Sequence, residues 1–169
     1  QHLAGPVALV AAHPDDETLG AGIAMAAMGK LTLIHITDGA PRDLRDATAH
    51  GFTDAATYAA ARRDELAAAL AAGGIAAETI CLGAADQHAA FEMPALIGQL
   101  AALLRARGVR VLVTQAYEGG HPDHDATALI AHRAARSLAT PPEILEMAGY
   151  HALGAGDFLP GGPIAATLG

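Results

Sequence analysis

The sequence predicts an α/β fold, a Rossmann-like three-layer sandwich in which helices cover both faces of a mostly parallel sheet. Short apolar runs alternate with helical stretches of ten or more residues, as expected for crossover units on such a sheet. Clusters of His, Asp and Glu follow the first and the fourth apolar run, at the carboxyl ends of strands where sites form in parallel sheets. The length of 169 residues suits one continuous core. We therefore expect residues 1–169 to form a single domain.

The individual elements follow from this alternation. Apolar runs predict strands at residues 7–12, 31–37, 79–82 and 109–114, with 146–150 as an added edge strand. Helical periodicity, glycines at helix ends and a proline at a helix start predict helices at 17–29, 58–72, 94–107 and 125–137. Two long polar connections, 38–53 and 83–93, interrupt the pattern. Long loops in a compact domain are often functional, so we expect these two to form the walls of a pocket.

Composition and charge argue against several classes of function. The formal net charge is -8 and the basic residues are few and scattered, which disfavours a nucleic-acid partner. No stretch approaches the roughly 20 apolar residues of a membrane span. No secretory signal is visible either, so we expect a soluble, cytoplasmic protein. The lone Cys81 excludes an internal disulfide and a zinc site built on cysteine pairs, and we expect it to be buried at the end of a strand.

The first cluster of polar residues spans 12–20 and reads Ala-His-Pro-Asp-Asp-Glu-Thr-Leu-Gly. The ordinary explanation for an aspartate here is that Asp15 or Asp16 caps the following helix. Capping accounts for only one of the three acids, however. Asp15, Asp16 and Glu17 repel one another at close quarters unless a cation is present. The segment therefore indicates a cation site that includes His13.

The second cluster spans 117–125 and reads Tyr-Glu-Gly-Gly-His-Pro-Asp-His-Asp. A lone histidine here would be an ordinary surface residue, but two histidines that bracket an aspartate are harder to explain in that way. Because a doubly wound sheet of order 3-2-1-4 makes the first and fourth strands neighbours, the two clusters meet in one crevice. His13, Asp16 and His124 then supply two nitrogens and one carboxylate oxygen, a ligand set of catalytic zinc sites. Asp123 can hydrogen-bond an imidazole nitrogen and fix its tautomer.

This ligand set does not name the reaction. Two histidines and a carboxylate also suit non-haem iron oxygenases, although those enzymes usually carry the triad on a double-sheet β fold. Fe²⁺ also remains an alternative metal for a hydrolase, since availability as well as affinity decides loading. A non-catalytic module that binds a metal or a ligand is a further alternative. An unligated carboxylate at Asp15 favours an enzyme over such a module.

Together the two clusters resemble the motifs of the PIG-L/LmbE-like zinc-dependent de-N-acetylases. The resemblance is carried by residues 12–17 and 121–124, with weaker support from Thr-Asp-Gly at 37–39 and Arg-Arg-Asp-Glu-Leu at 62–66, and it covers residues 7–137. It implies a hydrolase that uses Zn²⁺ to remove an acetyl or other acyl group from an N-acetylated amino sugar, such as an N-acetylglucosamine derivative. An amidase that acts on a larger sugar or thiol conjugate is the alternative. Such proteins usually continue past this point with a segment that helps shape the pocket, so the resemblance implies that a C-terminal segment is missing from the sequence.

The resemblance also assigns roles to the residues of the two clusters. The metal ligands fall on His13, Asp16 and His124, and the general base falls on Asp15. The imidazole that stabilises the oxyanion, in its protonated form, falls on His121. The same resemblance implies that Asp123 orients the ring of His121.

Substrate contacts are implied with less support. By resemblance they fall on Arg62 and, from its position in a loop alone, on Asp86. Some family members carry a tyrosine two residues before the first histidine of the second motif, where this chain has Gly119, and Tyr117 is the nearby tyrosine that could replace it. An exposed ion pair of Arg62 with Glu65 or Asp54 is the competing explanation for that arginine. The expected partner is the small-molecule substrate, and a homo-oligomer is compatible with the sequence.

Overall fold

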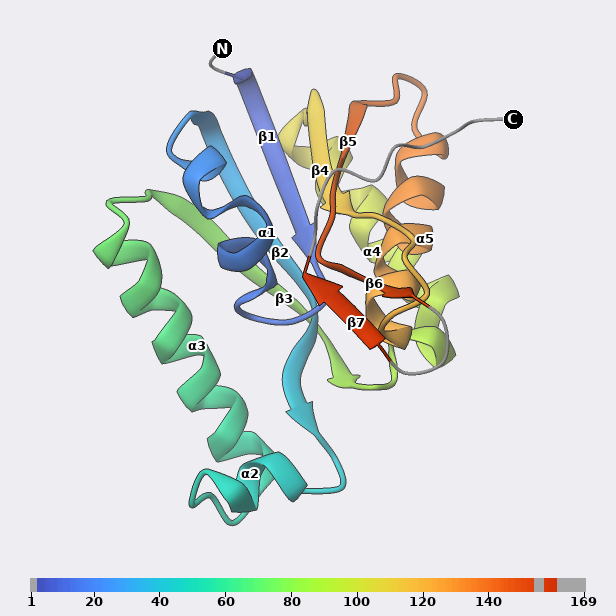
Figure 1. Ribbon diagram of the computed structural model, residues 1–169. Coiled ribbons are helices and arrows are strands. Elements are labelled where there is room, and N and C mark those ends of the chain that lie inside the picture. The colour runs from blue at the N-terminus through green and yellow to red at the C-terminus, as the bar shows by residue number, and fades with distance from the viewer. Residues whose placement is uncertain (1–2, 154–156, 161–169) are drawn as a thin grey trace.

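The computed structural model describes residues 3–153 and 157–160. Its centre is a five-stranded sheet with the order β3-β2-β1-β4-β5, in which every neighbouring pair is parallel (Figure 1). The strands are β1 (Leu3–Ala11), β2 (Met28–Pro41), β3 (Ala77–Asp86), β4 (Val111–Gln115) and β5 (Glu143–Met147). A short antiparallel pair, β6 (Tyr150–Leu153) and β7 (Asp157–Pro160), follows. The predicted α/β class and the expected order of the first four strands are confirmed.

The helices lie on both faces of this sheet, which gives three layers (Figure 1). They are α1 (Asp16–Met25), α2 (Arg45–Ala49), α3 (Ala55–Ala72), α4 (Ala89–Arg107) and α5 (Pro122–Arg136). Side chains of β1 alternate between the two faces, as a strand requires. Val10 packs with α4 and α5 in one apolar cluster, whereas Leu9 packs with α1 and α3 in another. Because both faces of β1 are covered, it is apolar along its whole buried length.

This arrangement positions the two polar clusters of the sequence. β1 lies between β2 and β4. The chain adds β2 and β3 on one side of β1 and β4 and β5 on the other side, so the strand order reverses at β1. The segments that follow β1 and β4 therefore lie beside each other at the carboxyl edge of the sheet, at the topological switch point where ligands bind in folds of this class. The expected convergence of the two clusters rests on this feature.

Several boundaries differ from the predictions. β2 continues to Pro41 and β3 to Asp86, so the first residues of both expected loops are strand, with Thr37 opposite Ala84. The first helix ends at Met25 and not at Gly29, which lies in β2. The edge strand β5 pairs over 143–147, in place of the expected 146–150. Pairing with a neighbouring strand decides these limits, and single-residue propensity does not carry that information.

Two further expectations need correction. The predicted helix start at Pro94 is wrong, because α4 begins at Ala89 and Pro94 lies inside it. Cys81 is exposed and lies within β3, not buried at a strand end. β3 is an edge strand of the sheet, so part of its surface is left uncovered.

Among the described residues, α4 is long and apolar enough to cross a membrane by length and composition alone. In this structure Leu96, Leu100 and Leu104 of that helix are buried in the core of the domain.

Candidate active site

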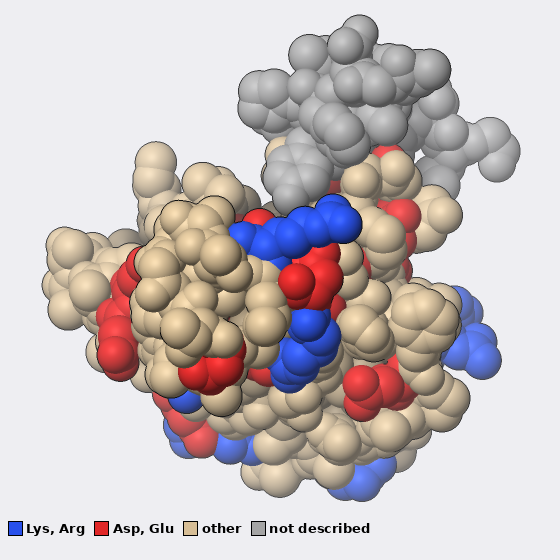
Figure 2. Space-filling view, turned by 90° about the horizontal axis from the view of Figure 1, so that it is seen from below, with Lys and Arg blue, Asp and Glu red and all other residues tan. Residues whose placement is uncertain are grey.

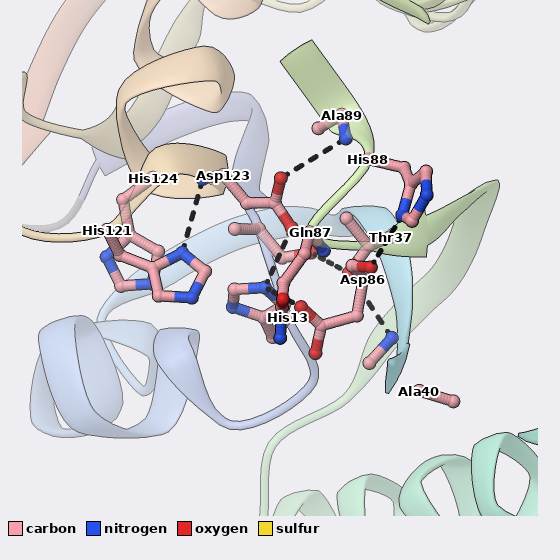
Figure 3. Close-up of polar contacts among 12 residues, drawn as sticks. His13, Thr37, Ala40, Asp86, Gln87, His88, Ala89, His121, Asp123 and His124 are labelled. Atoms are coloured by element: carbon pink, nitrogen blue, oxygen red, sulfur yellow. Dashed lines mark hydrogen bonds and ion pairs between the residues drawn. The ribbon is translucent and has the colours of Figure 1, made fainter. Parts of the chain in front are cut away.

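Six side chains converge at the carboxyl edge of the sheet, and we call them the acid–histidine cluster; Figure 3 labels all of them except Asp16. They come from the segment between β1 and α1, the start of α1, the end of β3 and the start of α5. Five of them are buried and one, His121, is half-buried. The members are His13, Asp16, Asp86, His121, Asp123 and His124.

His13 lies at the centre of this cluster. Its Nδ1 is 3.3 Å from Oδ2 of Asp16, and its Nε2 is 3.2 Å from Oδ2 of Asp123 and 3.2 Å from Oδ1 of Asp86. Nε2 of His124 lies 3.2 Å from the other carboxylate oxygen of Asp16. The Asp16 carboxylate therefore touches both histidines that the sequence predicts as metal ligands.

Two pairs of donor atoms in the cluster have the spacing of neighbouring ligands on a small divalent cation. Two ligand atoms bound at about 2.1 Å to one tetrahedral ion lie about 3.4 Å apart. The contacts of Asp16 with His13 and His124, at 3.3 and 3.2 Å, match that separation. Donor atoms of His13, His121 and His124 also lie within 4.8 Å of one another, as do those of His13, Asp86 and Asp123.

One acceptor near His13 lacks a hydrogen. Oδ1 of Asp86 is buried and accepts no hydrogen bond within the described part of the chain. It faces the same ring nitrogen as Asp123, and a single N–H cannot serve both carboxylates. An excess of buried carboxylate oxygens over hydrogens is the condition in which a cation is retained.

The pKa shifts of His13 and Asp16 also indicate that the cluster retains a positive charge. Burial lowers the pKa of His13, but the hydrogen bond to Asp123 and the close contacts with the carboxylates of Asp16 and Asp86 outweigh this effect and raise the pKa to about 12. Burial raises the pKa of Asp16, yet the hydrogen bonds with His124 and His13 hold it well below the usual range. Without a metal, the cluster therefore keeps a proton on His13. A divalent ion would replace that positive charge.

Asp15 differs from its neighbours in its exposure. Its side chain is 60% exposed and its carboxylate lies 2.9 Å from Nη2 of Arg62. Partial burial raises the pKa of this carboxyl, and the guanidinium of Arg62 lowers it by less. The backbone of Asp15 has φ 122°, a region that L residues rarely adopt. A partly exposed carboxylate with a raised pKa has the properties of a general base.

Asp123 makes contacts that differ from those the resemblance implies. Its buried carboxylate accepts hydrogen bonds from the backbone N–H groups of Gln87, at 2.6 Å, and Ala89, at 3.2 Å, and it contacts His13. The expectation that the Asp123 carboxylate orients the ring of His121 is therefore not met. His121 Nδ1 instead accepts the backbone N–H of Asp123 at 3.2 Å. The reason is geometric, because the start of α5 faces the segment between β3 and α4 (Figure 3).

The expected substrate residues fall in different environments. Arg62 is only 17% exposed in its side chain and reaches the carbonyl groups of Pro14 and Gly39 as well as Asp15. Its contact with Glu65 is longer, at 3.8 Å. The competing partner, Asp54, caps α3 by accepting the N–H of Thr57.

The other two candidates differ in exposure. Asp86 belongs to the acid–histidine cluster and faces His13. Tyr117 is 75% exposed. The structure thus brings Arg62 and Asp86 to the site and leaves the Tyr117 ring at the surface.

One cavity among the described residues is lined by none of the six residues of the acid–histidine cluster. This cavity of about 470 Å³ lies between α3 and β3, and Pro14, His35 and Asp38 line it together with apolar side chains. Asp38 is its only contribution from the connection 38–53, and residues 83–93 do not line it. Seen from below, acidic and basic side chains adjoin one another across the middle of the molecule (Figure 2). Among the described residues, Arg62 forms an ion pair with Asp15, and Arg42 forms one with Asp38.

Solved structures of the same fold have different activities. A deacetylase of an antimicrobial pseudoaglycone has a TM-score of 0.69 and 23% identity, over 83% of this chain and 63% of that chain. The N,N′-diacetylchitobiose deacetylase from Pyrococcus horikoshii has a TM-score of 0.63 and 21% identity, over 78% of this chain and 49% of that chain. The 4-carboxy-2-hydroxymuconate hydratase from Pseudomonas putida has a TM-score of 0.59 and 20% identity, over 78% of this chain and 56% of that chain. At such identities the likeness shows the fold alone.

The chain spans about half to two thirds of the length of these three proteins. The comparison with curated proteins found no match. The model of the family described as GlcNAc-PI de-N-acetylase, PIG-L, matches residues 8–135, which include the whole acid–histidine cluster. The chain therefore belongs to the PIG-L family of GlcNAc-PI de-N-acetylases.

Proposed function

We propose that this protein is a zinc-dependent N-deacetylase that hydrolyses the amide of an N-acetylated amino sugar or of a related small molecule. Membership of a de-N-acetylase family supports a hydrolytic deacetylase. The observation that carries the proposal is the contact of Asp16 with both His13 and His124, next to the partly exposed carboxylate of Asp15. A hydratase shares this fold, so the fold alone does not decide the reaction.

We assign the metal to His13, Asp16 and His124. A bound Zn²⁺ supplies a Lewis acid that polarises the amide carbonyl and makes water a better nucleophile at neutral pH. Nitrogen and carboxylate donors also accept Fe²⁺, which remains the alternative metal. Nε2 of His13 lies against Asp123, which leaves Nδ1, on the Asp16 side, as the ligand atom. A carboxylate behind a ligating imidazole is the usual support for such a ring.

Asp15 is assigned as the general base. It accepts a proton from the attacking water as the C–O bond forms, and it later delivers that proton to the nitrogen as the C–N bond breaks. Its raised pKa places the carboxyl closer to neutrality than an ordinary aspartate, which favours both transfers. Arg62 keeps the carboxylate in place through their 2.9 Å contact.

His121 is assigned to the oxygen of the tetrahedral species as a neutral ring, not in the protonated form that the resemblance implies. Burial lowers the pKa of this imidazole, and the electrostatic effect of the neighbouring His13 and His124 lowers it further. Its Nδ1 accepts the backbone N–H of Asp123, so the ring hydrogen is on Nε2. An N–H donor aimed at a developing oxyanion typically contributes about 100- to 1000-fold in rate.

The substrate contacts stay proposals. Arg62, which lies beside Asp15, is our candidate for contact with a sugar hydroxyl, and the exposed ring of Tyr117 is our candidate for contact with the sugar face. We keep Asp86 as a candidate, although its contact with His13 gives it a second role in supporting that ring. A larger sugar or thiol conjugate would use the same hydrolytic groups, and it is the alternative substrate class.

Metal analysis and an amine-release assay test this function. The purified protein is expected to bind one Zn²⁺ or Fe²⁺ and to release amine from at least one N-acetylated amino sugar or conjugate in a panel. Asp15→Asn is expected to keep its metal and to lose about 100-fold or more in turnover. The exposed Asp64→Asn on α3 is the matched control and should keep full activity. A wild-type protein that binds no metal refutes the proposal, and an active Asp15→Asn protein removes Asp15 from the mechanism.

A further inference from the structure

Glu17 is an acidic residue that the proposed mechanism does not use. It is fully buried in the first turn of α1, although Asp15 and Asp16 stand next to it in the sequence. A buried carboxylate beside two others is unfavourable unless hydrogen-bond donors compensate it. The residue therefore needs partners, and the structure supplies three.

The three donors connect Glu17 to its neighbours in the sequence, Asp15 and Thr18, and to His35 of β2. Oε2 accepts the backbone N–H of Asp15 at 3.1 Å, and Oε1 accepts the hydroxyl of Thr18 at 2.6 Å. Nε2 of His35 lies 2.9 Å from Oε2. Because an ionised carboxylate only accepts hydrogen bonds, Nε2 of His35 carries the hydrogen.

His35 connects this arrangement to the sheet. It is buried in β2, where it is paired in register with Ala11 of β1 and Cys81 of β3. Strand pairing on both sides therefore fixes the position of His35, and its hydrogen bond to Glu17 fixes the Glu17 carboxylate relative to the sheet.

Asp15 is the residue at the end of this chain of contacts. Its φ of 122° is unfavourable for a residue with a Cβ, and such a conformation persists only where the surroundings enforce it. Its carbonyl accepts the N–H groups of Thr18 and Leu19 in α1, at 2.9 and 3.0 Å. Its N–H is held by Glu17. Both ends of the strained residue are thus fixed, one by the helix and one by the buried carboxylate.

We propose that Glu17 and His35 are positioning residues, which hold Asp15 in its strained backbone conformation and so direct its carboxylate to the open side of the site beside Arg62. This inference rests on the proposed function, because it assigns Asp15 as the base. Neither residue is among those assigned to the metal or to the substrate, so in this proposal both act through Asp15. A plain structural brace between α1 and β2 would use the same contacts, and the experiment must separate the two roles.

The test replaces Glu17 by Gln, which preserves volume but leaves only one accepting oxygen for three donors. The metal content of Glu17→Gln is expected to equal that of the wild type, with KM unchanged and kcat for amine release lowered about 10- to 100-fold. His35→Leu should behave in the same way, whereas His35→Gln, which keeps a donor, should restore most of the activity. Glu65→Gln is the control, because it removes a carboxylate near Arg62 that lies outside the chain of contacts.

The decisive experiment measures kcat after Glu17→Gln is introduced into the Asp15→Asn protein. A positioning residue that acts through Asp15 has nothing left to position, so Glu17→Gln should lower the residual kcat no further. A full additional loss, a fall in metal content that accounts for the loss of turnover, or a Glu17→Gln protein with wild-type kcat would each overturn the inference.

A crystal structure of Glu17→Gln separates this inference from the proposed function. If the wild-type protein releases no amine from any substrate, the proposed function fails, but the backbone of Asp15 still answers the structural question. Departure of Asp15 from φ near 122° in the variant supports the positioning role. An unchanged Asp15 overturns it.

Discussion

Replacing Asp123 by Asn tests how much the acid–histidine cluster stabilises the fold. The Asp123 carboxylate is fully buried and faces three donors, the N–H groups of Gln87 and Ala89 and Nε2 of His13. Asn offers one oxygen and turns an NH₂ group towards at least one of these donors. One buried donor left without an acceptor costs about 1–3 kcal/mol, and each remaining hydrogen bond loses about 1 kcal/mol with the negative charge. Asp123→Asn should therefore lower the free energy of unfolding by about 3–5 kcal/mol.

The measurement is urea denaturation at neutral pH with a chelator present, so that metal binding does not contribute. Asp64→Asn is the control for the chemical change, because Asp64 is exposed on α3. Surface substitutions of this kind stay within about 0.5 kcal/mol of the wild type. A loss of the same small size in Asp123→Asn would refute the argument that this carboxylate is required by its buried donors.

Three further predictions concern charge, pH and packing. Arg62→Met removes the cation that lowers the pKa of Asp15, so the acidic limb of the kcat/KM profile should move to higher pH, and an unmoved limb would contradict the pairing. In the metal-free protein, the cluster aspartates with lowered pKa values stabilise the fold above the unfolded value of 3.8. Unfolding free energy measured with urea should therefore fall as the pH drops below that value, and a flat curve would speak against it. Gly39→Ala places a Cβ 2.8 Å from Cδ of Pro14, whereas Gly51→Ala, also at positive φ, meets open space. The first substitution should cost about 1–3 kcal/mol more than the second in thermal or urea unfolding, and equal costs would rule out the clash.

Strands and helices were predictable from the sequence where their side chains are buried on one face or on both faces. The apolar run of β1 and the periodicity of α3 indicate their elements directly, and the alternation of strands and helices gives the sheet order. The ends of β2 and β3 were not predictable. Asp38 and Pro41 read as loop residues, but they continue β2, which pairs with β3 as far as Asp86. Hydrogen bonding between distant segments overrides local propensity there.

The sequence predicted which residues meet in the site, but not all of the contacts that they make. The convergence of His13, Asp16 and His124 followed from two motifs placed after neighbouring strands. The role of His35 gave no signal, because the residue stands inside an apolar run and looks like any core position of β2. The partners of Asp123 also lay beyond the sequence, since its contact with His13 depends on how α5 packs against the segment before α4. Spacing along the chain identifies which residues meet, and packing decides which atoms do.

The contact between His13 and Asp123 joins residues that are 110 positions apart in the sequence. During synthesis, the motif after β1 leaves the ribosome long before its partners on α5 exist. A chain that has not yet added α5 holds two of the three proposed metal ligands, His13 and Asp16, and lacks the Asp123 carboxylate that contacts His13. If the proposed site binds its ion through these three residues, tight binding would wait until α5 has been synthesised, and the choice of ion would then depend on conditions at that later stage.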